Sequence, residues 1–202
     1  SDINFLNTLP KKEIICGYGE VLKHSIIANK SFFKFLNKNY LNIFNLKSPF
    51  IEKAIYQSCK IKKNIVEKDE NEKRTRKILN FGHTFGHAFE ASLGYSKKLN
   101  HGEAVILGIS LALKFSHINK LLNSNDYQSI TKHIKNSKLP NDIKKYFSLK
   151  DLNSILSFMT KDKKNTSSKI NLILLKKIGS ASYNFQFTKE KIKSFLIKEL
   201  TK

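Results

Sequence analysis

The 202-residue sequence has few of the residues that interrupt helices, with only three prolines and eight glycines. Lys, Leu, Ile, Asn and Phe are abundant instead, and this composition favours a mostly helical protein. Apolar residues make up 40% of the chain, which is enough for a hydrophobic core in one large domain or two small ones.

Long hydrophobic runs and paired cysteines are also missing. No segment approaches the roughly eighteen consecutive apolar residues of a membrane-spanning helix, so we expect no membrane span. The first residues, SDINFLNTLPKKE, lack the basic start and apolar run of a secretion signal. Cys16 and Cys59 do not have the spacing of a paired motif. The sequence therefore predicts reduced thiols in a cytosol-like, cytoplasmic compartment.

Arginine is nearly absent although the chain is strongly basic. Of the 37 Lys and Arg residues, which contribute to a formal net charge of +21, only Arg74 and Arg76 are arginines. Proteins that read nucleic acids commonly use Arg for its fork of donors, whereas Lys is spread here along the whole chain. A solvated Lys-rich surface explains the charge more simply than nucleic-acid binding, which we do not expect. The two Arg positions, in contrast, are expected to need a guanidinium.

Hydrophobic periodicity predicts a helical body with one small hairpin near the C-terminal end. Thr8 is the expected N-cap of the first helix, in which Gly17 and Gly19 are expected to allow close packing. Strand-like runs at 170–175 and 182–187 flank Gly179. The predicted helices cover residues 8–28, 31–46, 48–70, 78–94, 102–122 (apolar and expected to be central), 126–137 and 152–162, and a last one follows Thr188.

Two histidines four residues apart, His83 and His87, lie in the segment RKILNFGHTFGHAFE. Residues at this spacing share one face of a helix, and such a pair is a common chelate for zinc or a neighbouring metal. Two core histidines bonded to backbone carbonyls are the simpler alternative. His101, at the start of HGEAV, favours the metal, because a catalytic divalent ion usually has three protein ligands and one open position.

Glu20 is the carboxylate candidate for this site. It lies in an apolar predicted helix, where an unpaired carboxylate would be costly, and Lys23 follows at i+3. A surface Glu–Lys pair is the alternative, but the neighbouring Gly-Tyr-Gly indicates a crowded position. Further charged and amide side chains surround the histidines in the sequence, namely Lys62, Glu72, Arg76, Asn80 and the KDKK cluster at 161–164. Such a pocket suits a small polyhydroxylated, anionic substrate.

Three segments in this order, TLPKKEIICGYGEVLKH, KDENEKRTRKILNFGHTFGHAFE and LNHGEAVILGI, closely resemble the 3-dehydroquinate synthase family. The resemblance covers essentially the whole chain and implies that residues 1–202 form the family's C-terminal, helical, metal-binding domain. It also implies that the family's N-terminal, nicotinamide-binding domain is absent from this chain. Other sugar-phosphate cyclases and metal-dependent polyol dehydrogenases are more distant relatives, and they are the alternative.

The resemblance implies a role for each matching residue. A zinc or cobalt ion would be held by Glu20, His83 and His101, with His87 facing the substrate instead. The expected catalytic residues are Lys23, Glu72 and His87. The implied substrate contacts are Lys23, Lys62, Glu72, Arg76, Asn80, His87 and a lysine of the DKK segment, for which we favour Lys163 over Lys164.

The reaction implied by the resemblance converts 3-deoxy-D-arabino-heptulosonate 7-phosphate to 3-dehydroquinate and phosphate, a step of the shikimate pathway. It consists of oxidation by NAD⁺, elimination of phosphate, reduction and an internal aldol closure. Lys62, Arg76 and Asn80 together fit the carboxylate of this substrate, which a simple polyol lacks, and Arg76 could clamp it with two hydrogen bonds. NAD⁺ would be bound mainly by the absent domain, and a homodimer is the family expectation. On its own, the chain is expected to bind metal without turning over substrate.

Overall fold

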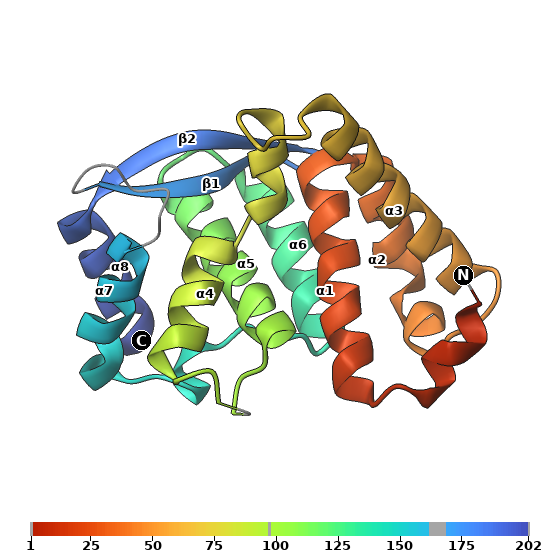
Figure 1. Ribbon diagram of the computed structural model, residues 1–202, viewed down its shortest axis with the longest axis horizontal. Helices are drawn as coiled ribbons and strands as arrows, with labels where there is room; N and C mark the ends of the chain where they lie inside the picture. The colour runs from red at the N-terminus through yellow and green to blue at the C-terminus, as the bar shows by residue number, and fades with distance from the viewer. Residues whose placement is uncertain (1, 97, 162–168, 202) are drawn as a thin grey trace.

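The computed structural model describes residues 2–96, 98–161 and 169–201. These residues form a helical body with one antiparallel hairpin near the C-terminal end, as the sequence predicted (Figure 1). None of the described helices is long and apolar enough to cross a membrane. The α-helices are Lys11–Ala28 (α1), Lys30–Phe44 (α2), Phe50–Lys68 (α3), His83–Ser92 (α4), His101–Ile118 (α5), Ser124–Asn136 (α6), Leu152–Lys161 (α7) and Lys189–Thr201 (α8). Short 3-10 helices cover Ile3–Thr8, Thr75–Asn80, Ile143–Lys145 and Leu149–Asp151.

Helix α5 is central, as its apolar sequence predicted. It packs against α1 and α4, and it also contacts α6 and the hairpin. In Figure 1, α1, α2 and α3 lie at one end of the molecule and α7 and α8 at the other, with the two termini at opposite ends. The helix begins at His101, one residue earlier than expected, because Asn100 and Glu103 form a reciprocal capping box there.

Glycines allow the close contacts between α5 and its neighbours. A Cβ atom added to Gly108 of α5 would lie 2.2 Å from the carbonyl oxygen of Gly82, so no larger residue fits between α5 and the start of α4. Gly19 of α1 faces Ile106, which confirms the close packing predicted at that position. The same prediction was wrong for Gly17, which is exposed and has no described atom within 4 Å of an added Cβ.

Several predicted helix boundaries were wrong, among them the end of α5, at Ile118 instead of 122, and the starts of α1 and α4. The Thr8 hydroxyl does not cap α1, because it donates to the carbonyl of Phe5 at 2.7 Å, and α1 begins after Pro10. The predicted helix 78–94 is divided into the 3-10 helix Thr75–Asn80 and α4, which begins at His83. Gly82 lies between them with φ of 83°, a left-handed conformation that favours glycine and cannot continue a helix.

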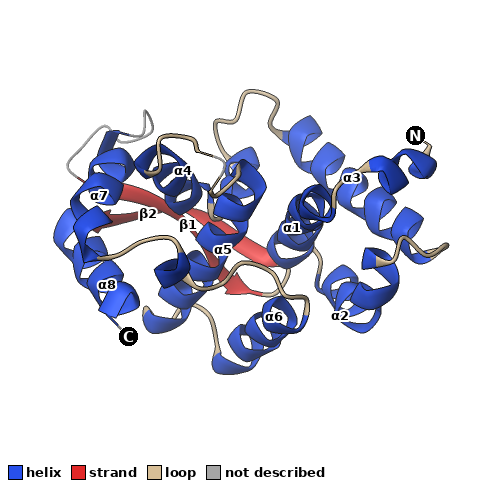
Figure 2. Ribbon diagram, turned by 90° about the horizontal axis from the view of Figure 1, so that it is seen from below, coloured by secondary structure: helices blue, strands red, loops and turns tan. Residues whose placement is uncertain are grey.

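The hairpin covers one side of the helices and completes the core. Strand β1 (Lys169–Lys177) pairs antiparallel with β2 (Ser180–Thr188), and its buried side chains are Ile170, Leu172, Leu174 and Leu175. Figure 2 shows the strands crossing α5 on the way from α7 to α1. Hydrogen bonds to the helices hold the hairpin in place, and among them Gly179 N donates to the carbonyl of Ile26 at 2.7 Å and Thr84 Oγ1 donates to that of Asn171 at 3.3 Å. The first part of β1 is thereby held against α4.

Candidate metal and substrate site

Helix α4 has one face in the core and one face that carries polar ligands. Phe85 and Phe89 are 1% and 0% exposed, and burying an aromatic side chain of this size stabilises the fold by about 2–3 kcal/mol. His83, His87 and Glu90 lie on the other face at i, i+4 and i+7, so the buried phenylalanines fix the direction in which the two histidines point.

Three imidazoles gather where α4 meets the start of α5. The ring centres of His83 and His87 are 5.2 Å apart, those of His83 and His101 are 6.1 Å apart, and those of His87 and His101 are 5.9 Å apart. A zinc ion lies roughly 3 Å from the centre of a ring that binds it, so two rings on one ion are about 6 Å apart at most. The His83–His87 and His87–His101 pairs are within this distance and the His83–His101 pair is at its limit, and the nearby carboxylates distinguish between the pairs.

The predicted ligands Glu20, His83 and His101 line one pocket of about 400 Å³, which we call the Glu20 pocket. Its other lining residues are Glu13, Cys16, Gly17, Asn100 and Gly102. The three side chains come from α1, α4 and α5, which pack together here, but among the described residues the group whose ligand atoms all lie within 4.8 Å of one another is a different one, His87, Glu90 and His101. Two imidazoles and one carboxylate are a donor set that suits zinc or cobalt.

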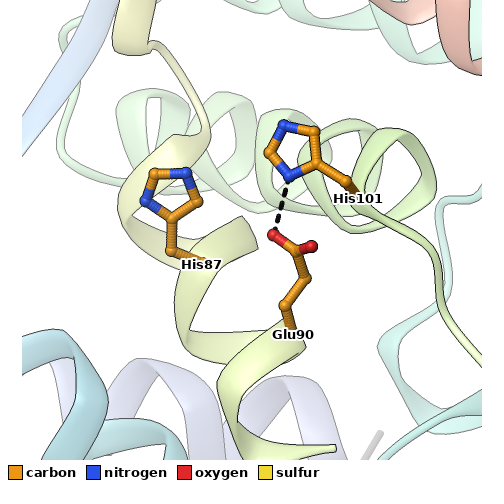
Figure 3. Close-up of side chains that lie close together, drawn as sticks. All are labelled: His87, Glu90 and His101. Atoms are coloured by element: carbon orange, nitrogen blue, oxygen red, sulfur yellow. Dashed lines mark hydrogen bonds and ion pairs between the residues drawn. The ribbon is translucent and has the colours of Figure 1, made fainter. Parts of the chain in front are cut away.

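A second carboxylate, Glu90, lies on the His87 side of this cluster and was missed from the sequence. One ligand atom each from His87, Glu90 and His101 lie within 4.8 Å of one another (Figure 3). The Nδ1 atom of His101 is 2.8 Å from Oε2 of Glu90. The signal was available, because Glu90 follows His87 by three residues and therefore shares its helix face.

The electrostatics of the Glu20 pocket favour metal binding. Burial, reinforced by the nearby charge of Lys23, lowers the pKa of His83 to about 3, so its imidazole is neutral at neutral pH. Burial alone would raise the pKa of Glu20, but the ammonium of Lys23 outweighs it and the pKa is lowered. A neutral imidazole and an ionised carboxylate are the forms that bind metal ions, so the residues present fit a divalent cation.

Lys23 is buried beside this pocket, at 2% exposed, and its Nζ lies 2.8 Å from the Glu20 carboxylate. The alternative of a surface Glu–Lys pair is therefore wrong for the lysine, whereas Glu20 is half-buried. Burial lowers the pKa of Lys23, and the adjacent carboxylate opposes this effect. Lys62 is exposed on α3, and its charge adds to the lowering of the Lys23 pKa, which places both cations near one site.

A second pocket of about 500 Å³ adjoins the first, and we call it the Asn80 pocket. The predicted substrate contacts Glu72, Asn80 and His87 line it together with His83, which also lines the Glu20 pocket. Asn80 Nδ2 donates to Glu72 Oε1 at 2.5 Å. The remaining lining residues are Lys77, Thr84 and six residues of the hairpin that sequence reasoning missed, namely Asn171, Leu172, Ile173, Tyr183, Asn184 and Gln186.

Arg76 lies in the first turn of the 3-10 helix Thr75–Asn80, after a loop held by Asp69, and is not among the described residues that line either pocket. The Asp69 carboxylate accepts hydrogen bonds from the backbone N–H groups of Lys73, Arg74 and Arg76, which lowers the pKa of Asp69. The Arg76 guanidinium donates to the carbonyl of Glu70. Its predicted contact with a substrate carboxylate stays a prediction, and Lys163 lies outside the described residues.

Solved structures of sugar-phosphate cyclases have the same fold. A 2-epi-5-epi-valiolone synthase from Streptomyces hygroscopicus subsp. jinggangensis 5008, with NAD⁺ and Zn²⁺ bound, matches with a TM-score of 0.82 at 19% identity, over 98% of this chain and 54% of that one. A 2-deoxy-scyllo-inosose synthase complexed with carbaglucose-6-phosphate, NAD⁺ and Co²⁺ matches with a TM-score of 0.78 at 25% identity, over 98% and 55%. The fold is therefore one that this class of synthases uses.

The sequence comparison is more specific than the fold. A family model of the 3-dehydroquinate synthase C-terminal region matches residues 17–165. The 3-dehydroquinate synthase of Pelagibacter ubique (strain HTCC1062) is 62% identical over 202 residues, which are 100% of this chain and 55% of the relative. That of Alkaliphilus metalliredigens (strain QYMF) is 38% identical, over 96% of this chain and 53% of the relative. The chain belongs to the 3-dehydroquinate synthase family, and it spans about half the length of the curated relatives it matches.

Proposed function

We propose that this chain is the metal- and substrate-binding part of a 3-dehydroquinate synthase. With NAD⁺ and a divalent metal, the whole enzyme would convert 3-deoxy-D-arabino-heptulosonate 7-phosphate to 3-dehydroquinate and phosphate. The observation that carries this proposal is the position of His83, which lines both the pocket with the metal-type donors and the pocket with the predicted substrate contacts. The 62% identity with a 3-dehydroquinate synthase supports the choice of reaction.

Glu20, His83 and His101 would hold the metal, which we propose to be zinc or cobalt. When bound, the ion would lower the pKa of a substrate hydroxyl and so assist its oxidation. His83 contributes a neutral imidazole because burial lowers its pKa to about 3. His87 is exposed one turn further along α4, where its ring could hydrogen-bond a substrate hydroxyl or take up its proton.

The substrate contacts would come from both sides of the Asn80 pocket. The bond to Glu72 holds the Asn80 amide in one orientation, and a fixed amide can discriminate between hydroxyl positions on a sugar. The buried ammonium of Lys23 would stabilise negative charge on the substrate. We further propose that Lys62, Arg76 and Lys163 bind the substrate's anionic groups, with Arg76 on the carboxylate.

NAD⁺ would be bound mainly outside this chain. Dinucleotide-binding folds use a parallel sheet with a Gly-rich turn, whereas the sheet formed by the described residues is a two-stranded antiparallel hairpin. Hydride transfer requires the nicotinamide to contact the substrate, so the site would lie between this chain and an N-terminal half. The family resemblance also leads us to propose a cytoplasmic homodimer.

The alternative is another sugar-phosphate cyclase or a metal-dependent polyol dehydrogenase on the same scaffold. A simple polyol, or a sugar phosphate without a carboxylate, would leave the cations and amide proposed for carboxylate binding without a partner. The identity with the solved cyclases is 19% and 25%, well below the 62% shared with the Pelagibacter ubique 3-dehydroquinate synthase. We therefore favour the heptulosonate phosphate as substrate.

A fusion protein tests the proposal. The N-terminal half of the Pelagibacter ubique relative is joined upstream of this chain, and phosphate release is measured with 3-deoxy-D-arabino-heptulosonate 7-phosphate, NAD⁺ and Co²⁺. We expect phosphate release by the fusion, loss of release in its His83→Asn variant, and none from the chain alone. A folded fusion that binds NAD⁺ and Co²⁺ but releases phosphate only from a carboxylate-free sugar phosphate would overturn the proposal.

A further inference from the structure

We propose that Glu90 is a positioning residue that holds the imidazole of His101 in the orientation and tautomer required for metal binding. The inference rests on the proposed function, because it concerns the same metal site. Its basis is the 2.8 Å contact between Oε2 of Glu90 and Nδ1 of His101 (Figure 3). These residues come from different helices, α4 and α5.

The backbone of His101 is fixed, but its side chain needs a partner. Asn100 and Glu103 form the capping box around it, and the Cys16 thiol donates to Asn100 Oδ1 at 3.2 Å. The His101 side chain is nonetheless 62% exposed, so core packing does little to select one rotamer. The Glu90 side chain is only 12% exposed and is held by its surroundings on α4. By donating a hydrogen bond to this well-held carboxylate, the His101 ring loses rotamer freedom before metal binding, which then costs less conformational entropy.

The contact also selects the tautomer of His101. A carboxylate has only acceptor sites, so the proton shared with Glu90 is on Nδ1 and the lone pair of a neutral ring is on Nε2. Nε2 is then the nitrogen available to a metal. In metal sites of this kind, a carboxylate on the second ring nitrogen fixes the ring and makes the ligand more basic.

The location of Glu90 supports a role beyond helix formation. It lies in the last turn of α4, which ends at Ser92, and a negative charge near a helix C-terminus is unfavourable because of the helix dipole. The contact with His101 offsets this cost only partly, since the imidazole is exposed to solvent. Positioning of the His101 ring therefore explains a carboxylate at this point better than stabilisation of α4 does.

A competing arrangement makes Glu90 a direct metal ligand together with His87 and His101, since their ligand atoms lie within 4.8 Å. The two arrangements differ in how Glu90 acts. A positioning residue affects the metal only through His101, so removing Glu90 costs nothing further once His101 has been replaced. A direct ligand contributes on its own in either background.

Two measurements on this chain test the proposal. Ring ¹⁵N chemical shifts of the metal-free protein report the His101 tautomer, and Co²⁺ titrations followed by calorimetry and visible absorption report metal affinity. The variants are Glu90→Ala, Glu90→Gln, His101→Asn and the double variant Glu90→Ala/His101→Asn. The matched control is Glu67→Gln, because Glu67 is exposed and its carboxylate lies 3.6 Å from the ammonium of Lys63. Circular dichroism checks that each variant folds.

We expect Glu90→Ala to lose the Nδ1-protonated tautomer and to weaken Co²⁺ binding about 10–100-fold, as removal of an outer carboxylate partner does at other metal sites. Glu90→Gln should lose less, because its amide oxygen still accepts from Nδ1, and the double variant should bind no more weakly than His101→Asn. An unchanged tautomer with affinity within about threefold would overturn the proposal, and so would a further loss in the double variant. If the unsubstituted chain binds no Co²⁺, the proposed metal site itself fails.

Discussion

The Nζ atom of Lys23 lies 2.8 Å from the Glu20 carboxylate, and the lysine is 2% exposed. Glu20→Gln would leave this buried ammonium without its counter-charge, so we expect the metal-free chain to lose about 1–3 kcal/mol of unfolding free energy. Urea denaturation measures the loss. Adding Lys23→Met to Glu20→Gln should recover part of it, because the uncompensated charge is removed. If Glu20→Gln is as stable as the parent protein, the ion pair contributes nothing to the fold.

Gly108 and Gly17 provide a matched pair of glycine substitutions. A Cβ at Gly108 would lie 2.2 Å from the Gly82 carbonyl oxygen, so Gly108→Ala should force α4 and α5 apart and cost about 3 kcal/mol. Gly17 lies in α1 with no described atom within 4 Å of an added Cβ, so Gly17→Ala should stabilise the helix by about 0.5–1 kcal/mol. Urea midpoints measure both. Equal effects of the two substitutions would contradict the close packing of α4 on α5.

His133 should make the fold sensitive to acid. It is fully buried, its Nε2 is 2.8 Å from the Tyr18 hydroxyl and its Nδ1 is 3.1 Å from Asn37 Oδ1. Burial lowers its pKa to about 4, from about 6.5 in the unfolded chain. Between pH 4 and pH 6.5 the unfolded state therefore binds more protons at His133 than the folded state does. The stability that the neutral, buried His133 contributes is complete above pH 6.5 and is lost as the pH falls towards 4.

From this residue we expect a loss of about 2 kcal/mol between pH 7 and pH 5. The measurement compares urea unfolding of the parent chain and His133→Gln at both pH values. The variant should be less stable at pH 7 but should show a smaller difference between the two conditions. The same pH difference in both proteins would show that His133 does not titrate as its burial requires.

Arg76→Lys tests whether a guanidinium is needed at the substrate. In the fusion with an N-terminal half, this substitution keeps the charge but loses the second hydrogen bond to a carboxylate, so we expect kcat/KM to fall about 10–100-fold. Lys73→Arg, at an exposed neighbour in the same loop, is the matched control and should leave kcat/KM near the parent value. Equal kinetics for both variants would mean that charge alone matters at Arg76.

The sequence predicted the parts of the fold that depend on local periodicity. The apolar run of α5 and the change to alternating residues in the hairpin are properties of neighbouring residues. The boundary at Gly82 was missed because Ile78 and Leu79 continue the apolar pattern of α4, whereas the left-handed turn depends on the close approach of Gly108. That approach is a tertiary contact, which periodicity does not encode.

The candidate site was predictable where it rests on motifs. The set Glu20, His83 and His101 came from family resemblance, and the structure places all three on one pocket. The spacing of Glu90 from His87 was a local signal, whereas the contact of Glu90 with His101 and the hairpin wall of the Asn80 pocket arise only when separate elements pack together. The loop before Arg76 is a further case, because the positive φ of 55° at Glu72 depends on how the loop folds around the Asp69 carboxylate and not on the hydrophobic periodicity.

The most direct test of the central claim is the Co²⁺ affinity of this chain with each donor replaced in turn. Because Glu20, His83 and His101 are proposed as the ligands, Glu20→Gln, His83→Asn and His101→Asn should each weaken binding by at least about 100-fold, more than the loss of an outer partner. His87→Asn should stay within about threefold of the parent chain. A large loss in His87→Asn with little change in Glu20→Gln and His83→Asn would contradict the claim and would assign the ion to His87, Glu90 and His101.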